Sequence, residues 1–193
     1  PMILAKEVAA LDFHSGGRFI FGIGTGWLRE EVEMFGADFP RRWTQTREAL
    51  DAMKAVWTNE IGEFHGKYYD IPPVRVFPKP AQKPYPPMVI GGAAKRVMER
   101  IVQHADGWLP NRVTPEDLKD HRAELDHLAT EAGRDPKTIK IHVYGQEPDR
   151  ALAEALTAAG ADEVIIRPRH VETEAEMDEQ LQEIAAKLID RDG

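Results

Sequence analysis

The amino-acid sequence predicts an α/β protein built on a parallel sheet that is covered by helices. From residue 87 onward, short apolar segments alternate with amphipathic segments of helical period, and short loops join them. An earlier apolar segment, residues 19–23, is also followed by helical sequence. Because parallel strands need a crossover connection, which is usually a helix, this alternation favours strand–helix units over hairpins. A closed barrel of eight such units takes about 250 residues, so the roughly five units here predict an open sheet or an incomplete barrel.

The residues before position 87 are expected to form one strand, three helices and an irregular insertion. We expect helices over residues 2–12, 28–35 and 46–57 and a strand over residues 19–23. In the first helix, Leu4, Val8 and Leu11 recur at helical spacing and should share its buried face. Residues 62–87 are rich in proline, glycine and aromatic side chains, with short β-like pieces between the breakers. They indicate a long excursion, compatible with a hairpin, between two repeating units.

The rest of the chain alternates strictly between strand and helix signals. We expect strands over 88–90, 138–144 and 163–166, a segment over 106–109 that leads into a loop, and helices over 94–105, 114–132, 149–159 and from 173 onward. Thr114 and Thr173 each offer an N-cap side chain, and Glu176 completes a capping box with Thr173. The strand over 163–166 is of the continuous apolar kind that is buried on both faces. The apolar seam of the last helix consists of Met177, Leu181, Ile184 and Leu188.

Composition limits the classes of function. With 193 residues and 42% apolar content, the chain can bury a core as one domain, which we place over residues 1–193. Against 33 acidic residues stand 25 Lys and Arg, and this net charge of -8 argues against nucleic-acid binding. There is no cysteine, so redox chemistry would need a bound cofactor. None of the seven histidines pairs with another at a spacing of three or four on a helix, so we expect no metal site. The sequence has no run of eighteen apolar residues and no signal-peptide pattern, so we expect no membrane partner and a cytoplasmic location.

The most informative segment runs from residue 17 to residue 31 and joins an apolar strand to an acidic helix start. Residues 22–27 read Gly-Ile-Gly-Thr-Gly-Trp, and glycines let the backbone come close to a ligand. The segment therefore predicts a binding site at the carboxyl end of the strand, although glycines there also suit a β-bulge or a rim kink. Glu31 follows in the first helical turn, where an acid is more often a partner of the helix dipole than a catalytic group.

A second glycine pair, Gly91 and Gly92, follows the strand over 88–90 and directly precedes the helix that is expected from Ala94. The unpaired N–H groups of a helix N-terminus bind anions, so Gly91, Gly92 and Ala93 form a candidate anion site. The alternative is a tight strand-to-helix turn that requires glycine without any ligand.

Six short motifs follow one another along most of the chain. They are Leu4-Ala5-Lys6-Glu7-Val8-Ala9 with Leu11-Asp12 and Ser15-Gly16-Gly17-Arg18; Gly22-Ile23-Gly24-Thr25-Gly26-Trp27 with Glu30-Glu31; Phe64-His65-Gly66-Lys67-Tyr68-Tyr69; Pro78-Lys79-Pro80 with Pro86-Pro87; Ile90-Gly91-Gly92; and Ala105-Asp106-Gly107-Trp108. In this order they resemble the luciferase-like monooxygenase superfamily, and most closely its branch of oxidoreductases that use the deazaflavin coenzyme F420. No single motif is specific, but six of them in this order form a strong signal.

The resemblance implies a (β/α)8 barrel, usually dimeric, with the cofactor across the carboxyl ends of the strands. On that pattern residues 2–12 match the helix after the third strand and residues 19–23 match the fourth strand. The first three strands have no counterpart in this sequence. We therefore expect a partial TIM barrel of about five βα units, preceded by one helix, with an irregular insertion at about residues 62–87.

The resemblance further implies an oxidoreductase or monooxygenase subunit that transfers hydride between a deazaflavin or flavin and a small organic substrate. F420 is the expected cofactor, and FMN is the alternative. By match to the family's motifs, the cofactor-binding residues are Gly24, Thr25, Gly26, Trp27, Gly91, Gly92 and Ala93. Trp108 is expected on the substrate side. No catalytic residue is assigned; Glu31 lines up with the family's acidic position and is the only candidate.

A different class of function is also open to this sequence. An unclosed sheet leaves an unpaired strand edge and apolar surface, both of which favour association. The chain would then be a truncated, catalytically silent paralogue that acts as a binding or assembly module, or a fragment of a longer product. Both the enzyme and the module are expected to form a homodimer or a higher oligomer.

Overall fold

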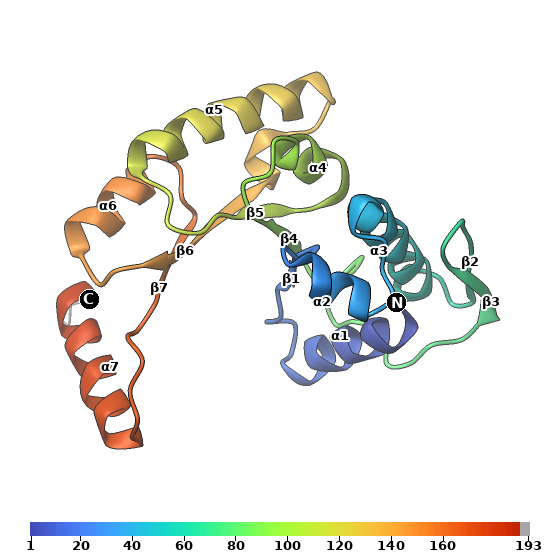
Figure 1. Ribbon diagram of the computed structural model, residues 1–193, viewed down its shortest axis with the longest axis horizontal. Helices are drawn as coiled ribbons and strands as arrows, with labels where there is room; N and C mark the ends of the chain where they lie inside the picture. The colour runs from blue at the N-terminus through green and yellow to red at the C-terminus, as the bar shows by residue number, and fades with distance from the viewer. Residues whose placement is uncertain (190–193) are drawn as a thin grey trace. The chain divides into compact units, whose positions relative to one another are not determined.

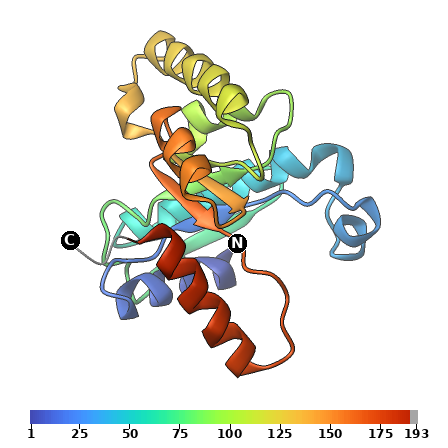
Figure 2. The ribbon, with the colours of Figure 1, turned by 90° about the vertical axis from the view of Figure 1, so that its left-hand side faces the viewer.

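The structure is a computed structural model of the protein and describes residues 1–189 (Figures 1 and 2). Contacts between Cα atoms divide the described residues into two compact units, residues 1–88 and residues 89–189. Within these described residues the main sheet has five strands in the order β1-β4-β5-β6-β7, and a separate two-stranded sheet consists of β2 and β3. The expected α/β class with about five strands is confirmed.

The first unit contains three α-helices, the first strand of the main sheet and a hairpin. Its elements are α1 (Met2–His14), β1 (Phe21–Ile23), α2 (Arg29–Met34), the 3₁₀ turn η1 (Phe39–Arg41), α3 (Arg42–Thr58), β2 (Gly62–His65) and β3 (Asp70–Val74). The hairpin pairs β2 with β3 antiparallel and lies in the predicted irregular insertion. In this unit α3 contacts both α1 and β2 (Figure 1). The long helix α3 is therefore the element around which the first unit packs.

The buried face of α1 differs from the expected one. Leu4 and Leu11 are exposed by 44% and 54%, whereas Ala5, Val8 and Ala9 are buried. Alanine side chains let the backbone of α1 come close to α3, and the indole Nε1 of Trp57 donates a hydrogen bond of 2.9 Å to the backbone oxygen of Ala5. The prediction for Leu4 and Leu11 is wrong because close helix packing favours the small residues.

A buried carboxylate fixes the end of α1. Asp12 is fully buried, and its two carboxylate oxygens accept hydrogen bonds from the backbone nitrogen of Gln82 at 2.9 Å and from its side-chain amide at 2.7 Å. The same amide nitrogen donates to the backbone oxygen of Phe19 at 2.8 Å. Asp12 and Gln82 thus join α1, the segment that leads into β1, and the loop that follows the hairpin.

The second unit consists of strand–helix repeats. Its elements are β4 (Met88–Gly91, which begins at the last residue of the first unit), α4 (Val97–His104), β5 (Gly107–Leu109), α5 (Pro115–Glu131), the 3₁₀ turn η2 (Pro136–Thr138), β6 (Lys140–Gln146), α6 (Arg150–Ala158), β7 (Glu163–Ile166) and α7 (Glu174–Leu188). Strands β4 to β7 pair parallel in chain order, and α4, α5 and α6 lie along one side of them (Figure 1). Side chains from strands and helices meet in a core that includes Ile101, Leu118, Leu125, Ile141 and Val143.

The N-caps predicted at Thr114 and Thr173 are confirmed, whereas the predicted apolar seam of the last helix contains an error. Thr114 accepts a hydrogen bond from the backbone nitrogen of Asp117 at 3.1 Å, and Thr173 and Glu176 form the full capping box. On α7, however, Leu181 is half exposed and Gln180 is buried. The amide of Gln180 bonds both backbone groups of Arg169, which lies between β7 and α7. Strand β7 has the predicted bounds, but its apolar residues are half-buried rather than buried on both faces.

None of the helices in the described part of the chain combines the length and the apolar character that a membrane crossing requires.

The contacts of Asp12 predict a clear loss of stability in Asp12→Ala. The substitution removes the buried carboxylate that accepts from two half-buried donors of Gln82, so we expect the free energy of unfolding to fall by about 2 kcal/mol. Urea denaturation measures this, with Glu7→Ala as the control because Glu7 is exposed on the same helix. Equal stability of the two variants would contradict the role given to Asp12.

Candidate functional site

The first unit contains a cavity of about 480 Å³ beside the carboxyl end of β1. This volume lies within the range of roughly 300–1,000 Å³ that is typical of small-molecule sites. Its apolar walls come from Leu4, Phe21, Ile23, Val32, Phe35, Leu50 and Met53. Its polar lining residues are Thr25, Glu31, Arg42, Gln45, Thr46 and Tyr69. A mostly apolar cavity with a few polar groups suits a flat organic ring more than a highly charged ligand.

The glycines of the β1–α2 loop line this cavity for two different reasons. Gly26 has φ of +77°, and a Cβ atom at this position would lie 2.6 Å from Cγ2 of Val32. Gly26 is therefore required by the loop conformation itself. At Gly24, an added Cβ would meet nothing within 4 Å. The space beside Gly24 is open, as the close approach of a ligand to the backbone requires.

The other predicted residues of this loop differ in their positions. Thr25 and Glu31 line the cavity, and Glu31 lies in the first turn of α2. Trp27 is 83% exposed and is not among the lining residues. A contact between Trp27 and a cofactor remains a prediction, as do the roles of Thr25 and Glu31.

Arg42 fixes the glycine loop and was not found from the sequence. Helix α3 begins at Arg42, four residues before the expected start at residue 46. The Nε of Arg42 donates to the backbone oxygen of Gly26 at 3.1 Å, and its Nη1 donates to that of Phe39 at 2.8 Å. The guanidinium also lies 3.9 Å from the centre of the Phe39 ring, a cation–π contact. One side chain thus holds the loop and the entry to α3 together.

A second polar side chain of α3 acts in the same way. The Oε1 of Gln45 accepts a hydrogen bond of 3.0 Å from the backbone nitrogen of Asp38, in the segment between α2 and η1. Pro40 lies in η1, directly before α3, and proline is common in the first turn of helices, so this residue could have indicated the earlier start. The helix over 46–57 was expected from apolar residues at helical spacing. Arg42 and Gln45 are polar, so this pattern did not include them.

In the second unit, the glycine turn after β4 differs from the expected geometry. Gly92 has φ of +97°, and a Cβ there would meet nothing within 4 Å. Helix α4 begins at Val97 rather than at Ala94, because a turn closed by Val97 N and Ala94 O at 2.8 Å comes first. The prediction that helix N–H groups follow Gly91 and Gly92 directly is therefore wrong. The assignment of Gly91, Gly92 and Ala93 to a cofactor remains a prediction, which rests on the family motif and on the open turn.

Trp108 of β5 lies behind this glycine turn. Its side chain is only 1% exposed, and its Nε1 donates a hydrogen bond of 2.9 Å to the backbone oxygen of Gly92. The ring also makes an edge contact with the His121 ring, with centroids 5.1 Å apart. In the described structure Trp108 is a buried support of the turn, and its contact with a substrate remains a prediction.

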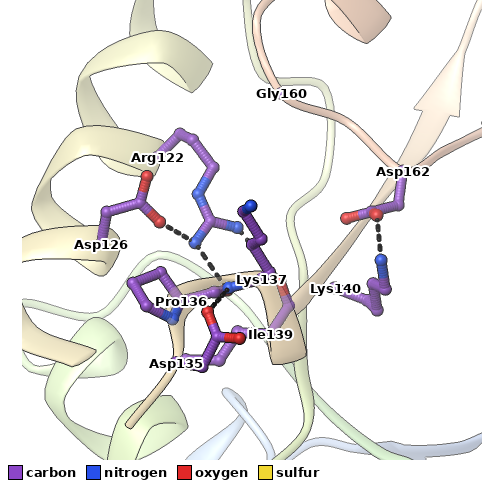
Figure 3. Close-up of a pocket in the computed structure, with 9 residues that line it drawn as sticks. All are labelled: Arg122, Asp126, Asp135, Pro136, Lys137, Ile139, Lys140, Gly160 and Asp162. Carbon is purple, nitrogen blue, oxygen red and sulfur yellow. Dashed lines mark hydrogen bonds and ion pairs between the residues drawn. The ribbon is translucent and has the colours of Figure 1, made fainter. Parts of the chain in front are cut away.

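A larger cavity in the second unit is a poorer candidate (Figure 3). It measures about 570 Å³ and lies between α5, η2 and the residues that enter β6 and β7. Figure 3 shows two ion pairs in it, Arg122 with Asp126 and Lys140 with Asp162, the latter at 2.7 Å, while the Asp135 carboxylate accepts from the backbone nitrogen of Lys137. The two charges of each pair neutralise each other. The cavity also lies at the amino ends of the strands, whereas ligand sites of parallel sheets lie at the carboxyl ends. Within residues 1–189, no cluster of histidines and acids is arranged to hold a metal ion.

Comparison with protein families identifies the class of this chain. The model of the luciferase-like monooxygenase family matches residues 1–191, and the chain therefore belongs to that family. The predicted family membership and the predicted partial luciferase-like barrel are both confirmed.

Individual relatives agree with this assignment. An uncharacterized protein of Mycobacterium tuberculosis is 36% identical over 148 residues, which cover 74% of this chain and 51% of that protein. The FMNH(2)-dependent dimethylsulfone monooxygenase of Pseudomonas putida is 26% identical over 175 residues, or 85% of this chain and 47% of that enzyme. The chain thus spans about half the length of these curated relatives.

A solved structure shows the same fold. An F420-dependent secondary alcohol dehydrogenase, in complex with an F420-acetone adduct, superposes with a TM-score of 0.74 at 18% identity. The match covers 97% of this chain and 75% of that one. By their names, two of these three proteins depend on reduced FMN or on F420. The family match gives no support to the alternative of a silent assembly module over an oxidoreductase.

The two loop glycines give a matched pair of substitutions. We expect Gly26→Ala to lower the free energy of unfolding by about 1–3 kcal/mol, because alanine is strained at positive φ. We expect Gly24→Ala to keep wild-type stability and to weaken binding of F420 or FMN, because the methyl group would occupy the open space. Urea denaturation and ligand titration measure the two effects. Binding to Gly24→Ala as tight as to wild type would remove Gly24 from the site.

Proposed function

We propose that this chain is the cofactor-binding part of a luciferase-like oxidoreductase that transfers hydride between a deazaflavin or flavin and a small organic substrate. F420 is the first choice of cofactor, and FMN is the alternative. In this proposal residues 1–193 belong to one incomplete barrel domain, with residues 62–87 as its insertion. The reaction takes place in the cytoplasm.

One observation carries the proposal: in a member of this family, a cavity of small-molecule size adjoins the carboxyl end of a barrel strand and has a glycine loop on its wall. Barrel enzymes place their active sites at this end of the strands. The lining is mainly apolar, and the open space beside Gly24 permits a ring to lie against the backbone. The cavity therefore fits a flat ring with a polar edge.

The chain's own residues would bind and orient the cofactor. When bound, the deazaflavin or flavin ring supplies the hydride chemistry. The backbone at Gly24 and the hydroxyl of Thr25 would contact it, and Arg42 would hold their loop through the carbonyl of Gly26. The backbone N–H groups at Gly91, Gly92 and Ala93 would bind a phosphate group of the cofactor, since a Cβ atom at Gly92 would meet nothing within 4 Å.

Titration of the native protein with F420 and, separately, with FMN tests this proposal. We expect saturable binding of F420, followed by its fluorescence, and weaker binding of FMN. Tighter binding of FMN than of F420 would reverse the choice of cofactor. Binding of neither would refute the proposed function.

The proposal includes self-association as a homodimer or a higher oligomer. Helix α1 exposes large apolar side chains, and Ile3, Leu11 and Phe13 are each more than half exposed. Ile3 and Leu11 are eight residues apart and so lie on one side of the helix. Apolar side chains in such a row favour burial against a second copy.

Analytical ultracentrifugation should therefore find an oligomer, and Leu11→Glu should shift it toward the monomer. The control is Ile61→Glu, which changes a similarly exposed apolar residue outside α1. A compact monomer for the wild-type protein, or equal dissociation in the two variants, would contradict the role of α1.

A further inference from the structure

The turn of the β2–β3 hairpin is held by one side chain of α3. Oε1 of Glu48 accepts hydrogen bonds from the backbone nitrogens of Tyr68 at 2.5 Å and of Tyr69 at 2.9 Å. The turn itself is closed by Gly66 N and Tyr69 O at 2.8 Å. A Cβ atom at Gly66 would overlap the Glu48 carboxylate, so glycine is needed for this close approach. Glu48 thus holds a turn whose Tyr68 lies twenty residues further along the sequence.

This turn brings one of two neighbouring tyrosines to the cavity. Tyr69 lines the cavity beside β1, and Tyr68 is not among its lining residues. Tyr69 contributes to the wall together with Gln45, Thr46 and Ala49 of α3, the turns of helix next to Glu48. A small rotation of the hairpin turn would therefore change what the cavity presents to a ligand.

We propose that Tyr69 contacts the ligand of this cavity and that Glu48 acts through it, as the residue that positions the turn. The inference rests on the proposed function and deepens it. The ligand it implies is a flat ring edged with carbonyl acceptors, which is the chemistry of the deazaflavin and flavin rings.

The electrostatics of the pair agree with these roles. Burial raises the pKa of the Tyr69 phenol, and the nearby Glu48 charge raises it further, so the hydroxyl keeps its proton at neutral pH and can donate. Burial also raises the pKa of Glu48, but the backbone N–H groups of Tyr68 and Tyr69 outweigh it, and the pKa lies below its ordinary value. Glu48 is therefore a carboxylate at neutral pH, and it loses its charge only in more acidic solution.

A double-mutant cycle on the native protein tests the proposal, with the dissociation constant of F420, and of FMN in parallel, as the readout. Tyr69→Phe removes one hydrogen bond to the ligand and should weaken binding about tenfold. Glu48→Ala should weaken binding by a similar factor because it releases the turn. If Glu48 acts through Tyr69, the double variant should be about tenfold weaker than wild type, whereas independent effects would multiply to roughly a hundredfold.

Two matched controls separate this role from a general loss of structure. Tyr68→Phe changes the neighbouring tyrosine outside the cavity, and Asp51→Ala removes an exposed acid from the next turn of α3. Both should bind the cofactors as the wild type does. If Glu48→Ala fails to fold, Glu48→Gln keeps an acceptor oxygen without the charge and should weaken binding by a smaller factor, again without adding to Tyr69→Phe.

Each outcome bears on one claim. If the wild type binds a cofactor and Tyr69→Phe binds it equally tightly, the inference is overturned, but the proposed function is not. If the double variant weakens binding by the product of the two single effects, Glu48 does not act through Tyr69, and its positioning role is overturned. A wild-type protein that binds neither cofactor overturns the proposed function and this inference with it.

Discussion

The first unit depends on one constraint: the backbone groups of its loops need hydrogen-bond partners, and the side chains of α3 supply them. Arg42, Gln45 and Glu48 follow one another at intervals of three residues, so they project from neighbouring turns of the same helix. Each bonds the backbone of a different segment: the glycine loop, the segment before η1, and the hairpin turn. Helix α3 is in turn fixed by its buried side, where Trp57 bonds the backbone of α1. The loops around the cavity are thus all held by hydrogen bonds to the same helix, α3.

Much of the fold could be predicted because apolar period and capping residues are local signals. The bounds of β7 and the capping box of α7 were predicted without error, and the helix over 46–57 was placed in the right region. What the sequence could not provide were the contacts that depend on distant partners. Glu48 has the appearance of an ordinary surface acid of a helix, and only the folded chain brings it to a turn twenty residues away. The two alanines of α1 were likewise overlooked, because tight helix packing favours residues that a hydrophobicity pattern ranks low.

The glycine loop shows how far the candidate site could be predicted. Its pattern correctly indicated a loop at the end of a strand, and the cavity does adjoin it. The pattern could not separate Gly24 from Gly26, although the first leaves space open and the second satisfies a positive φ against Val32. The sequence alone does not distinguish a glycine that the backbone conformation needs from a glycine that leaves room for a ligand. Only dihedral angles and neighbouring atoms distinguish them.

The hydrogen bond between Trp108 and Gly92 determines more than the position of a carbonyl group. A trans peptide unit is planar, and its C=O and N–H bonds point in opposite directions. Since the oxygen of Gly92 is turned toward the buried indole, the N–H of Ala93 must be turned the other way. The direction in which the turn presents the N–H of Ala93 is therefore set from within the core, by the aromatic side chain of Trp108.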